Sequence, residues 1–172
     1  MHRIATLAVL GSVTPRFGSA VPGIVDGVNP PSVPEQFVAK FVDFWNAPSP
    51  ERLPELLHPD VVLVQPLASR MIGIESAQAE FHRFCCCLPD LRGRVDRWCG
   101  DGNLVFIEFR LHARVGRKAV EWPNVNRLVL HEGKAIERVT YFDPLTILPT
   151  LAAHPSIWWR WWHSRGTHGL TS

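Results

Sequence analysis

Alternating apolar and polar residues predict a β-hairpin in the second half of the chain. Two strand-like runs within residues 118–144 are joined by Glu132 and Gly133, and a glycine adopts the positive φ that a tight hairpin turn needs. In the first run, every second residue belongs to one row, which is apolar except for two asparagines. The row consists of Val120, Trp122, Asn124, Asn126, Leu128 and Leu130. Because buried amides need partners, this row predicts an internal hydrogen-bond network or a ligand pocket.

The segment before this hairpin predicts two more antiparallel strands. Residues 104–115 alternate between an apolar row and a row that contains Glu108, and Gly116 and Arg117 form the turn that follows. Residues 94–99 predict a short strand that leads into this one through a turn at Asp101 and Gly102.

Apolar residues at helical spacing predict three helices in the first half. The first begins at Pro34 and ends before Pro48, and its aromatic face consists of Phe37, Phe41, Phe44 and Trp45. A short second helix begins at Pro50, and a third runs from Ile74 to just before Pro89.

Between the second and third helices, residues 58–60 predict a turn, 61–65 a strand and 66–73 a polar loop. The order of helices, strand, helix and antiparallel strands predicts an α+β fold, in which a strongly bent sheet wraps over the helices.

Composition at the two ends predicts one domain with two extensions. We assign residues 1–33 to a flexible N-terminal extension or leader, 34–148 to the domain and 149–172 to a C-terminal extension rich in tryptophan. The apolar run from Ile4 to Val13 imitates a secretory signal but is too short to span a bilayer. The tryptophans from Trp158 to Trp162 fit contact with a membrane surface, or closure over the domain or a dimer partner.

Charge and cysteine spacing exclude several classes of function. The formal net charge of +2 gives no basic stripe, so we expect no nucleic-acid partner. The consecutive residues Cys85, Cys86 and Cys87 would point about 100° apart on a helix and cannot converge on one metal ion. We therefore expect reduced thiols in a cytoplasmic protein. The histidines lack metal-ligand spacing and no glycine-rich phosphate loop occurs, so we expect neither a metal nor a cofactor.

Three segments of the chain carry a family resemblance: LHPDVVLVQP from Leu57, IGIESAQAEF from Ile72 and HEGKAIERVTYFDPL from His131. They resemble the SnoaL-like branch of the nuclear transport factor 2-like superfamily, which contains polyketide cyclases, ketosteroid isomerases and limonene epoxide hydrolases. The resemblance covers about residues 34–148. It implies a cone-shaped, curved antiparallel sheet wrapped around three helices and one deep apolar pocket. It also implies a homodimer through the outer face of the sheet, against which a monomeric mass at micromolar concentration would count.

The catalytic residues of these relatives match this sequence only in part. The resemblance implies an acid on the last strand, where Thr140 stands, and a general base just before Pro66, where Gln65 stands. Of the positions that match the hydrolase pair on the strand before Gly116, only Glu108 is acidic. The oxyanion donor of the isomerases matches Asn126, which can still donate a hydrogen bond.

The orientation of Glu108 stays open between two alternatives. A two-residue turn at Gly116 and Arg117 pairs Ile107 with Asn126 and turns Glu108 outward, whereas a β-bulge near Pro123 would turn it inward. We expect catalytic roles for Glu108 and Asn126. The residues expected to line the pocket are Asn124, Thr140, Arg138, Gln65, Phe41, Trp45 and Trp122.

We expect the pocket to bind a small hydrophobic molecule of steroid, terpene or polyketide type. In a cofactor-independent isomerase or cyclase, Glu108 would move a proton while Asn126 and Asn124 stabilise an enolate-like oxygen. One alternative is a ligand-binding or accessory protein without turnover, and another is a peripheral membrane protein anchored by its C-terminal tryptophans. Proton chemistry requires an inward Glu108, whereas a carrier requires only the cavity.

Overall fold

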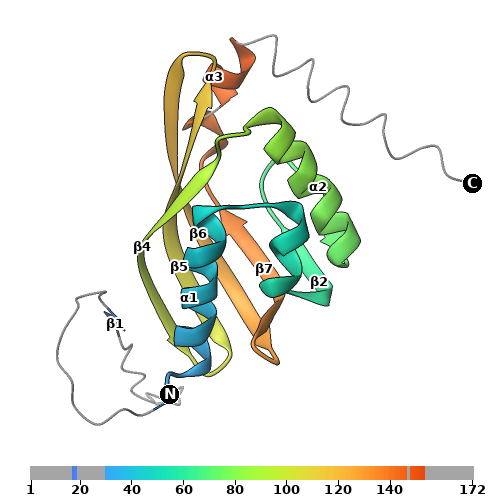
Figure 1. The fold of residues 1–172 in the computed structure, drawn as a ribbon, viewed down its shortest axis with the longest axis vertical. Coiled ribbons are helices and arrows are strands. Elements are labelled where there is room, and N and C mark those ends of the chain that lie inside the picture. The colour runs from blue at the N-terminus through green and yellow to red at the C-terminus, as the bar shows by residue number, and fades with distance from the viewer. Residues whose placement is uncertain (1–16, 19–29, 147, 154–172) are drawn as a thin grey trace, which may run out of the picture.

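The computed structural model describes residues 17–18, 30–146 and 148–153 and has an α+β architecture (Figure 1). The strands are β1 (Phe17–Gly18), β2 (Leu57–Val64), β3 (Met71–Ile72), β4 (Arg92–Asp101), β5 (Leu104–Val115), β6 (Lys118–His131) and β7 (Lys134–Tyr141). The helices are α1 (Val33–Asn46), α2 (Ile74–Cys87) and α3 (Leu148–Ala152), with two 3₁₀ helices, η1 (Pro50–Glu55) and η2 (Pro144–Thr146).

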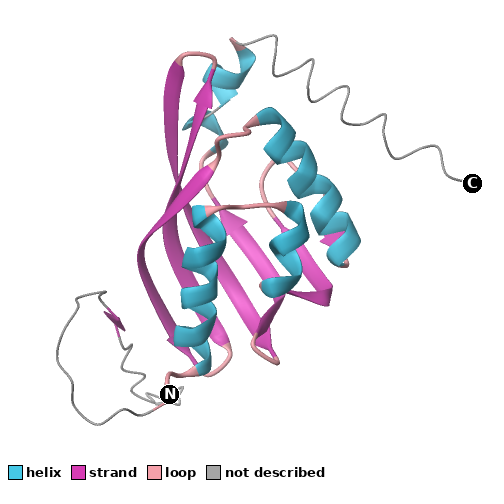
Figure 2. Ribbon diagram, viewed as in Figure 1, coloured by secondary structure: helices cyan, strands magenta, loops and turns pink. Residues whose placement is uncertain are grey.

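One bent sheet carries the fold, in the order β1-β4-β5-β6-β7-β2-β3, and α1, η1 and α2 lie together on one of its faces (Figure 2). The predicted α+β fold with a curved sheet over three helices is confirmed. The sheet is mixed rather than antiparallel, because β2 pairs with β7 in parallel. These two strands are far apart in the sequence and no hairpin joins them, so the chain places no constraint on their relative direction.

Helix α1 forms where its apolar pattern predicts it, and a capping box marks its start. The Ser32 hydroxyl accepts from the backbone N–H of Glu35, and the Glu35 carboxylate accepts from the backbone N–H of Ser32. This capping box satisfies two N–H groups that a helix start leaves without partners. The aromatic face of α1 packs against the sheet, and the Phe41 ring meets the Phe109 ring edge-on at 5.2 Å. This packing fixes the helical layer on the sheet.

Strand β2 begins earlier than its sequence predicts. Residues 58–60, predicted as a turn, lie within β2, and between the pairs Leu57–Ala135 and Val62–Glu137 the strand advances five residues while β7 advances two. The prediction of a turn is wrong because Pro59, which lacks an N–H group, is accommodated in this irregular stretch of strand. The predicted loop after β2 also contains β3, which pairs with β2.

Strands β5 and β6 pair without interruption from Val115–Lys118 to Leu104–Val129. The alternative of a bulge near Pro123 is therefore wrong. Pro123 lies beyond Val125–Tyr141, the last pair that joins β6 to β7, so one edge of β6 is unpaired there. A strand tolerates a proline at such an edge position. The regular register fixes which side chains of β5 and β6 face the helices.

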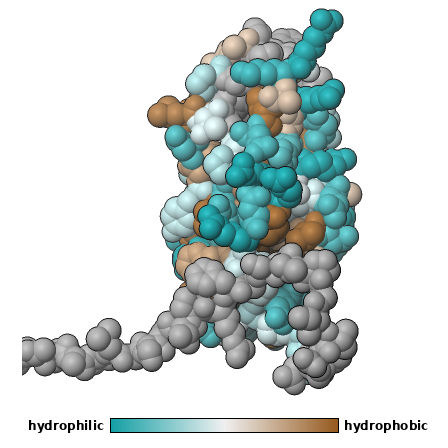
Figure 3. Space-filling model, turned by 90° about the vertical axis from the view of Figure 1, so that its left-hand side faces the viewer, coloured by the Kyte–Doolittle hydropathy of each residue, from teal (hydrophilic) through white to brown (hydrophobic). Residues whose placement is uncertain are grey.

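The outer face of the sheet is covered by charged side chains in ion pairs. Arg110 pairs with Asp96 and Glu121 at 2.7 and 2.9 Å, and Arg127 pairs with Glu137. Figure 3 shows hydrophilic side chains across much of this side of the molecule, with apolar patches between them. The homodimer through this face stays a prediction.

Parts of the predicted extensions lie outside the described residues, namely 1–16, 19–29 and 154–172, which include Trp158 to Trp162. Phe17 and Gly18 pair as β1 with Cys99 and Trp98 of β4. Within the described ranges, no helix combines the length and apolar character needed to cross a bilayer.

Candidate functional site

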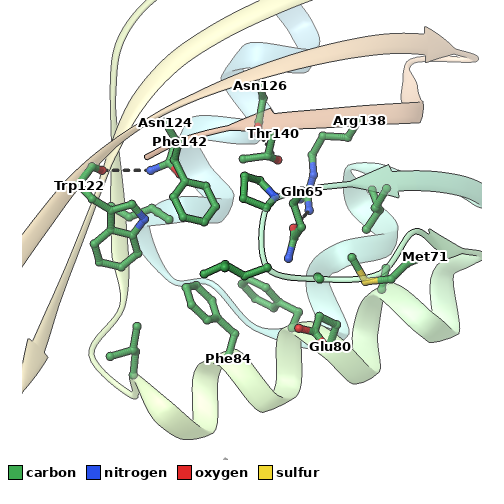
Figure 4. Close-up of a pocket in the computed structure, with 18 of the residues that line it drawn as sticks. Gln65, Met71, Glu80, Phe84, Trp122, Asn124, Asn126, Arg138, Thr140 and Phe142 are labelled. Atoms are coloured by element: carbon green, nitrogen blue, oxygen red, sulfur yellow. Dashed lines mark hydrogen bonds between the residues drawn. The ribbon is translucent and has the colours of Figure 1, made fainter. Parts of the chain in front are cut away.

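A cavity of about 300 Å³ lies between the helix-covered face of the sheet and α2. Its wall is mostly apolar, with aromatic side chains such as Phe84 and Trp122. Figure 4 shows side chains of β6 and β7 on one wall and side chains of α2 on the opposite one. The polar side chains of the wall are Gln65, Glu80, Asn124, Asn126, Arg138 and Thr140. A mainly apolar cavity with a few polar groups is the usual form of a small-molecule site.

Asn126 and Thr140 form one polar pair on this wall. They are direct neighbours across β6 and β7, and the Thr140 hydroxyl donates to Asn126 Oδ1 at 2.8 Å. The Asn126 side chain is 1% exposed. Its Nδ2 makes no hydrogen bond to another described residue, so this N–H₂ group is left to donate to an oxygen in the cavity.

Asn124 lies on the same face of β6, two residues before Asn126 and two after Trp122. Its Nδ2 donates to the backbone carbonyl of Trp122 at 3.0 Å, which leaves Oδ1 as an acceptor on the cavity side. The two asparagines of the apolar row therefore have different roles: Asn124 offers an acceptor and Asn126 a donor.

Arg138 and Gln65 form a second polar pair. The parallel pairing of β2 with β7 ends at Val64–Val139, which brings Gln65 beside Arg138. Arg138 Nη2 donates to Gln65 Oε1 at 3.0 Å, while Arg138 Nε is buried without a partner among the described residues. Burial lowers the pKa of the Arg138 guanidinium to about 10, so the group is still positively charged at neutral pH.

Glu108 lies on the outer face of the sheet and not in the cavity. The pair Ile107–Asn126 places Ile107 on the cavity side of β5 and turns Glu108 outward. Its carboxylate accepts from Arg97 Nη2 at 3.2 Å, and the hydrogen bond from the Arg97 guanidinium holds the pKa of the Glu108 carboxyl below its ordinary value. The structure thus contradicts a catalytic Glu108 in the cavity, because the regular β5–β6 register points this side chain away from it.

Phe41 is also displaced from its predicted place. It is 3% exposed and packs in the core against Phe109 and Trp45, where it does not line the cavity. Its place one turn before Trp45 on α1 puts it behind that residue, so Trp45 reaches the cavity and Phe41 supports it. The other residues predicted to line a pocket do lie on the cavity wall, as does Asn126: Asn124, Thr140, Arg138, Gln65, Trp45 and Trp122.

Sequence reasoning missed Glu80, which lies on the cavity wall of α2. Its carboxylate pairs with Arg83 on the same helix, Arg83 Nε donating at 3.0 Å. Glu80 follows Ala77 by three residues and precedes Phe84 by four, a helical spacing that places it on the same face as these wall residues. This spacing could have predicted from the sequence that Glu80 lines the cavity.

A second cluster of polar side chains, at one end of the sheet, consists of His58, His131 and Glu132. Their possible ligand atoms lie within 4.8 Å of one another. His58 Nδ1 already accepts the backbone N–H of Asp60 at 3.2 Å, and the two imidazole rings meet edge-on at 5.5 Å. One potential metal-binding nitrogen is thus occupied, and the expectation of no metal stays a prediction.

The family model of the SnoaL-like domain matches residues 38–138, which is more than half of the sequence. The chain belongs to the SnoaL-like domain family. The match spans the segment from α1 to Arg138, which contains most of the cavity wall. The resemblance found in the sequence is thereby confirmed. A comparison with curated proteins gave no match.

Solved structures of low sequence identity share the fold. A protein of Jannaschia sp. CCS1, provisionally assigned as a SnoaL-like polyketide cyclase, is 19% identical with a TM-score of 0.62, over 74% of this SnoaL-like chain and 99% of its own. An LEH-like epoxide hydrolase of M. tuberculosis is 17% identical with a TM-score of 0.57, over 70% and 90% of the two chains. An NTF2-like protein of unknown function from Burkholderia pseudomallei K96243 is 16% identical with a TM-score of 0.61, over 69% and 97%. At these identities, the likeness establishes the fold and leaves the chemistry to the residues of the site.

Proposed function

We propose that this SnoaL-like protein binds a small, mostly apolar organic molecule, of steroid, terpene or polyketide type, in the cavity between the sheet and α2. The observation that carries the proposal is the combination of a cavity of about 300 Å³ with apolar walls and polar groups gathered on β6, β7 and the end of β2. Apolar walls supply affinity through the hydrophobic effect, and the polar groups set the orientation of the ligand. The polyketide cyclase and epoxide hydrolase assignments of structural neighbours agree with a ligand of this kind.

The side chains of the cavity wall favour ligand binding without catalysis. Proton transfer needs a group that can gain and lose a proton near neutral pH. On the described wall, the one carboxylate is Glu80, which is held by Arg83, and Glu108 lies outside the cavity. The amide of Asn126 and the hydroxyl of Thr140 do not act as bases at neutral pH. These side chains support the proposal of a ligand-binding or accessory protein over that of an isomerase or cyclase.

Filling the cavity is expected to weaken binding strongly. Ala77 lies on the α2 wall and is 2% exposed, so an Ala77→Phe side chain would project into the cavity and occupy part of it. We expect this variant to bind the neutral apolar fluorophore N-phenyl-1-naphthylamine at least tenfold more weakly than the wild type. Fluorescence titration of the full chain measures the difference.

The matched control is Ala79→Phe on the same helix. Ala79 is half-buried and does not line the cavity, since it lies about 200° around the helix from Ala77. This control is expected to bind the fluorophore like the wild type, and circular dichroism establishes that both variants fold. Equal affinity of the wild type and Ala77→Phe would exclude the cavity as the binding site.

A further inference from the structure

Arg138 places a positive charge on the cavity wall without an opposite charge beside it. Within the described part of the chain, no carboxylate lies within ion-pair distance of its guanidinium, and the neutral Gln65 is its one side-chain partner. The carboxylate of Glu80, on the opposite wall, is paired with Arg83. The Arg138 side chain is half-buried and its Nε is fully buried, and a charge held partly out of water is stabilised when it is paired and hydrogen-bonded. The missing partner of Arg138 is therefore a feature that needs an explanation.

A second observation points to the same place. Among the described side chains, two buried polar atoms lack hydrogen-bond partners, Arg138 Nε and Trp45 Nε1, and both carry a hydrogen to donate. Both residues line the cavity and also a recess of about 20 Å³ behind it. A water molecule in this recess could accept from both groups but would bring no charge. Among the described residues, no anionic acceptor lies beside these two donors, since the Glu80 carboxylate of the wall is paired with Arg83.

We propose that the ligand of this cavity is an organic carboxylate, whose carboxylate pairs with Arg138 while its apolar body lies along the aromatic wall. This inference rests on the proposed function and adds the chemical class of the ligand. An arginine presents N–H groups in a planar fork that matches the two oxygens of a carboxylate. One cation compensates one negative charge, which favours a carboxylate over a phosphate dianion.

The surroundings of Arg138 orient such a carboxylate. Gln65 accepts one N–H of Nη2 at 3.0 Å and thereby fixes the guanidinium plane, while the remaining N–H groups of Nη1 and Nη2 have no partner among the described residues. Asn126 Nδ2 offers a further neutral donor on the same wall, which suits a second oxygen on the ligand. The apolar side chains of α2 face these groups across the cavity (Figure 4).

Pairs of ligands that differ mainly in charge distinguish the contribution of the carboxylate to binding from that of the apolar body. We would titrate the full-length protein by calorimetry with 2-naphthoate and 2-naphthamide, and with decanoate and decanamide, which differ in charge and little in shape. The wild type is expected to bind each carboxylate at least tenfold more tightly than its amide, because hydrogen bonds to charged groups are the stronger ones. Arg138→Gln, which keeps a neutral donor, is expected to lose this preference and to keep its affinity for the amides.

The control is Arg127→Gln, which removes an arginine from the outer face, where it pairs with Glu137. It is expected to keep the preference for carboxylates. Equal binding of carboxylate and amide by the wild type would overturn the carboxylate inference and leave the proposed function standing. Binding of neither member of the pairs would overturn both. The comparison within the wild type decides the question even if Arg138→Gln does not fold.

Discussion

Replacing Arg138 by methionine is expected to raise the melting temperature of the unliganded protein. The Arg138 side chain is half-buried in the cavity wall without an opposite charge beside it, and its buried Nε has no partner among the described residues. Methionine has a flexible apolar side chain that fits an apolar wall and carries no charge to bury. Removing this half-buried, uncompensated charge is expected to stabilise the protein by about 1–2 kcal/mol, which is about 2–8 °C for a chain of this size.

Differential scanning calorimetry without ligand measures this effect, with Arg127→Met as the control. Arg127 pairs with Glu137 on the outer face, so its replacement removes an ion pair and is not expected to stabilise the protein. A marked fall in the melting temperature of Arg138→Met would show that Arg138 supports the fold. A rise, together with loss of carboxylate binding, would identify a residue kept for its ligand at the expense of stability.

Replacing Gly93 by valine is expected to lower the free energy of unfolding by about 2–3 kcal/mol. Gly93 lies on β4, opposite Leu111 of β5, and the indole of Trp45 covers it. A Cβ atom at this position would lie 2.8 Å from Trp45 Cγ and 2.9 Å from Trp45 Cδ2, closer than real contacts allow. Trp45 also packs against Phe41, Phe44, Phe81 and Phe109, so its indole cannot move without disturbing the core.

Urea unfolding followed by circular dichroism measures the loss. The control is Arg94→Val, which places the same side chain on the same strand at a position whose native side chain is 66% exposed. We expect that variant to remain close to the wild type, since valine is favoured in strands. Surface substitutions typically change stability by no more than about 0.5 kcal/mol. A change of that size in Gly93→Val would mean that the Trp45 indole does not cover Gly93 as described.

Local sequence patterns predicted the helices and the hairpins of this fold, because these elements depend on residues that are close together in the sequence. The positive φ of Gly133 and the alternation along 118–131 predict the hairpin of β6 and β7, where Glu132 also adopts a positive φ of 51°. The pairing of strands that are distant in the sequence could not be predicted in this way. The parallel contact of β2 with β7 and the irregular stretch at 58–60 depend on segments that are distant in the sequence.

In the candidate site, too, local patterns were predictable and features that depend on long-range pairing were not. Alternation on β6 and β7 placed Asn124, Asn126 and Thr140 on the wall, but the orientation of Glu108 depended on the β5–β6 register. A shift of one residue in the register moves every side chain of a strand to the opposite face. The two-residue turn at Gly116 and Arg117, followed by an uninterrupted register, places Glu108 on the outer face. The missing counter-charge of Arg138 could not be predicted, because it depends on where each carboxylate of the chain lies in space.

The central claim, that the cavity is a ligand site, is tested most directly by native mass spectrometry of the full-length protein purified gently from its own host. We predict that the wild type retains a small molecule, and that the Ala77→Phe variant from the same host does not. Extraction and identification would then show whether the molecule carries a carboxylate, as Arg138 requires. A wild-type protein free of any small molecule, or the same molecule retained by Ala77→Phe, would contradict the account.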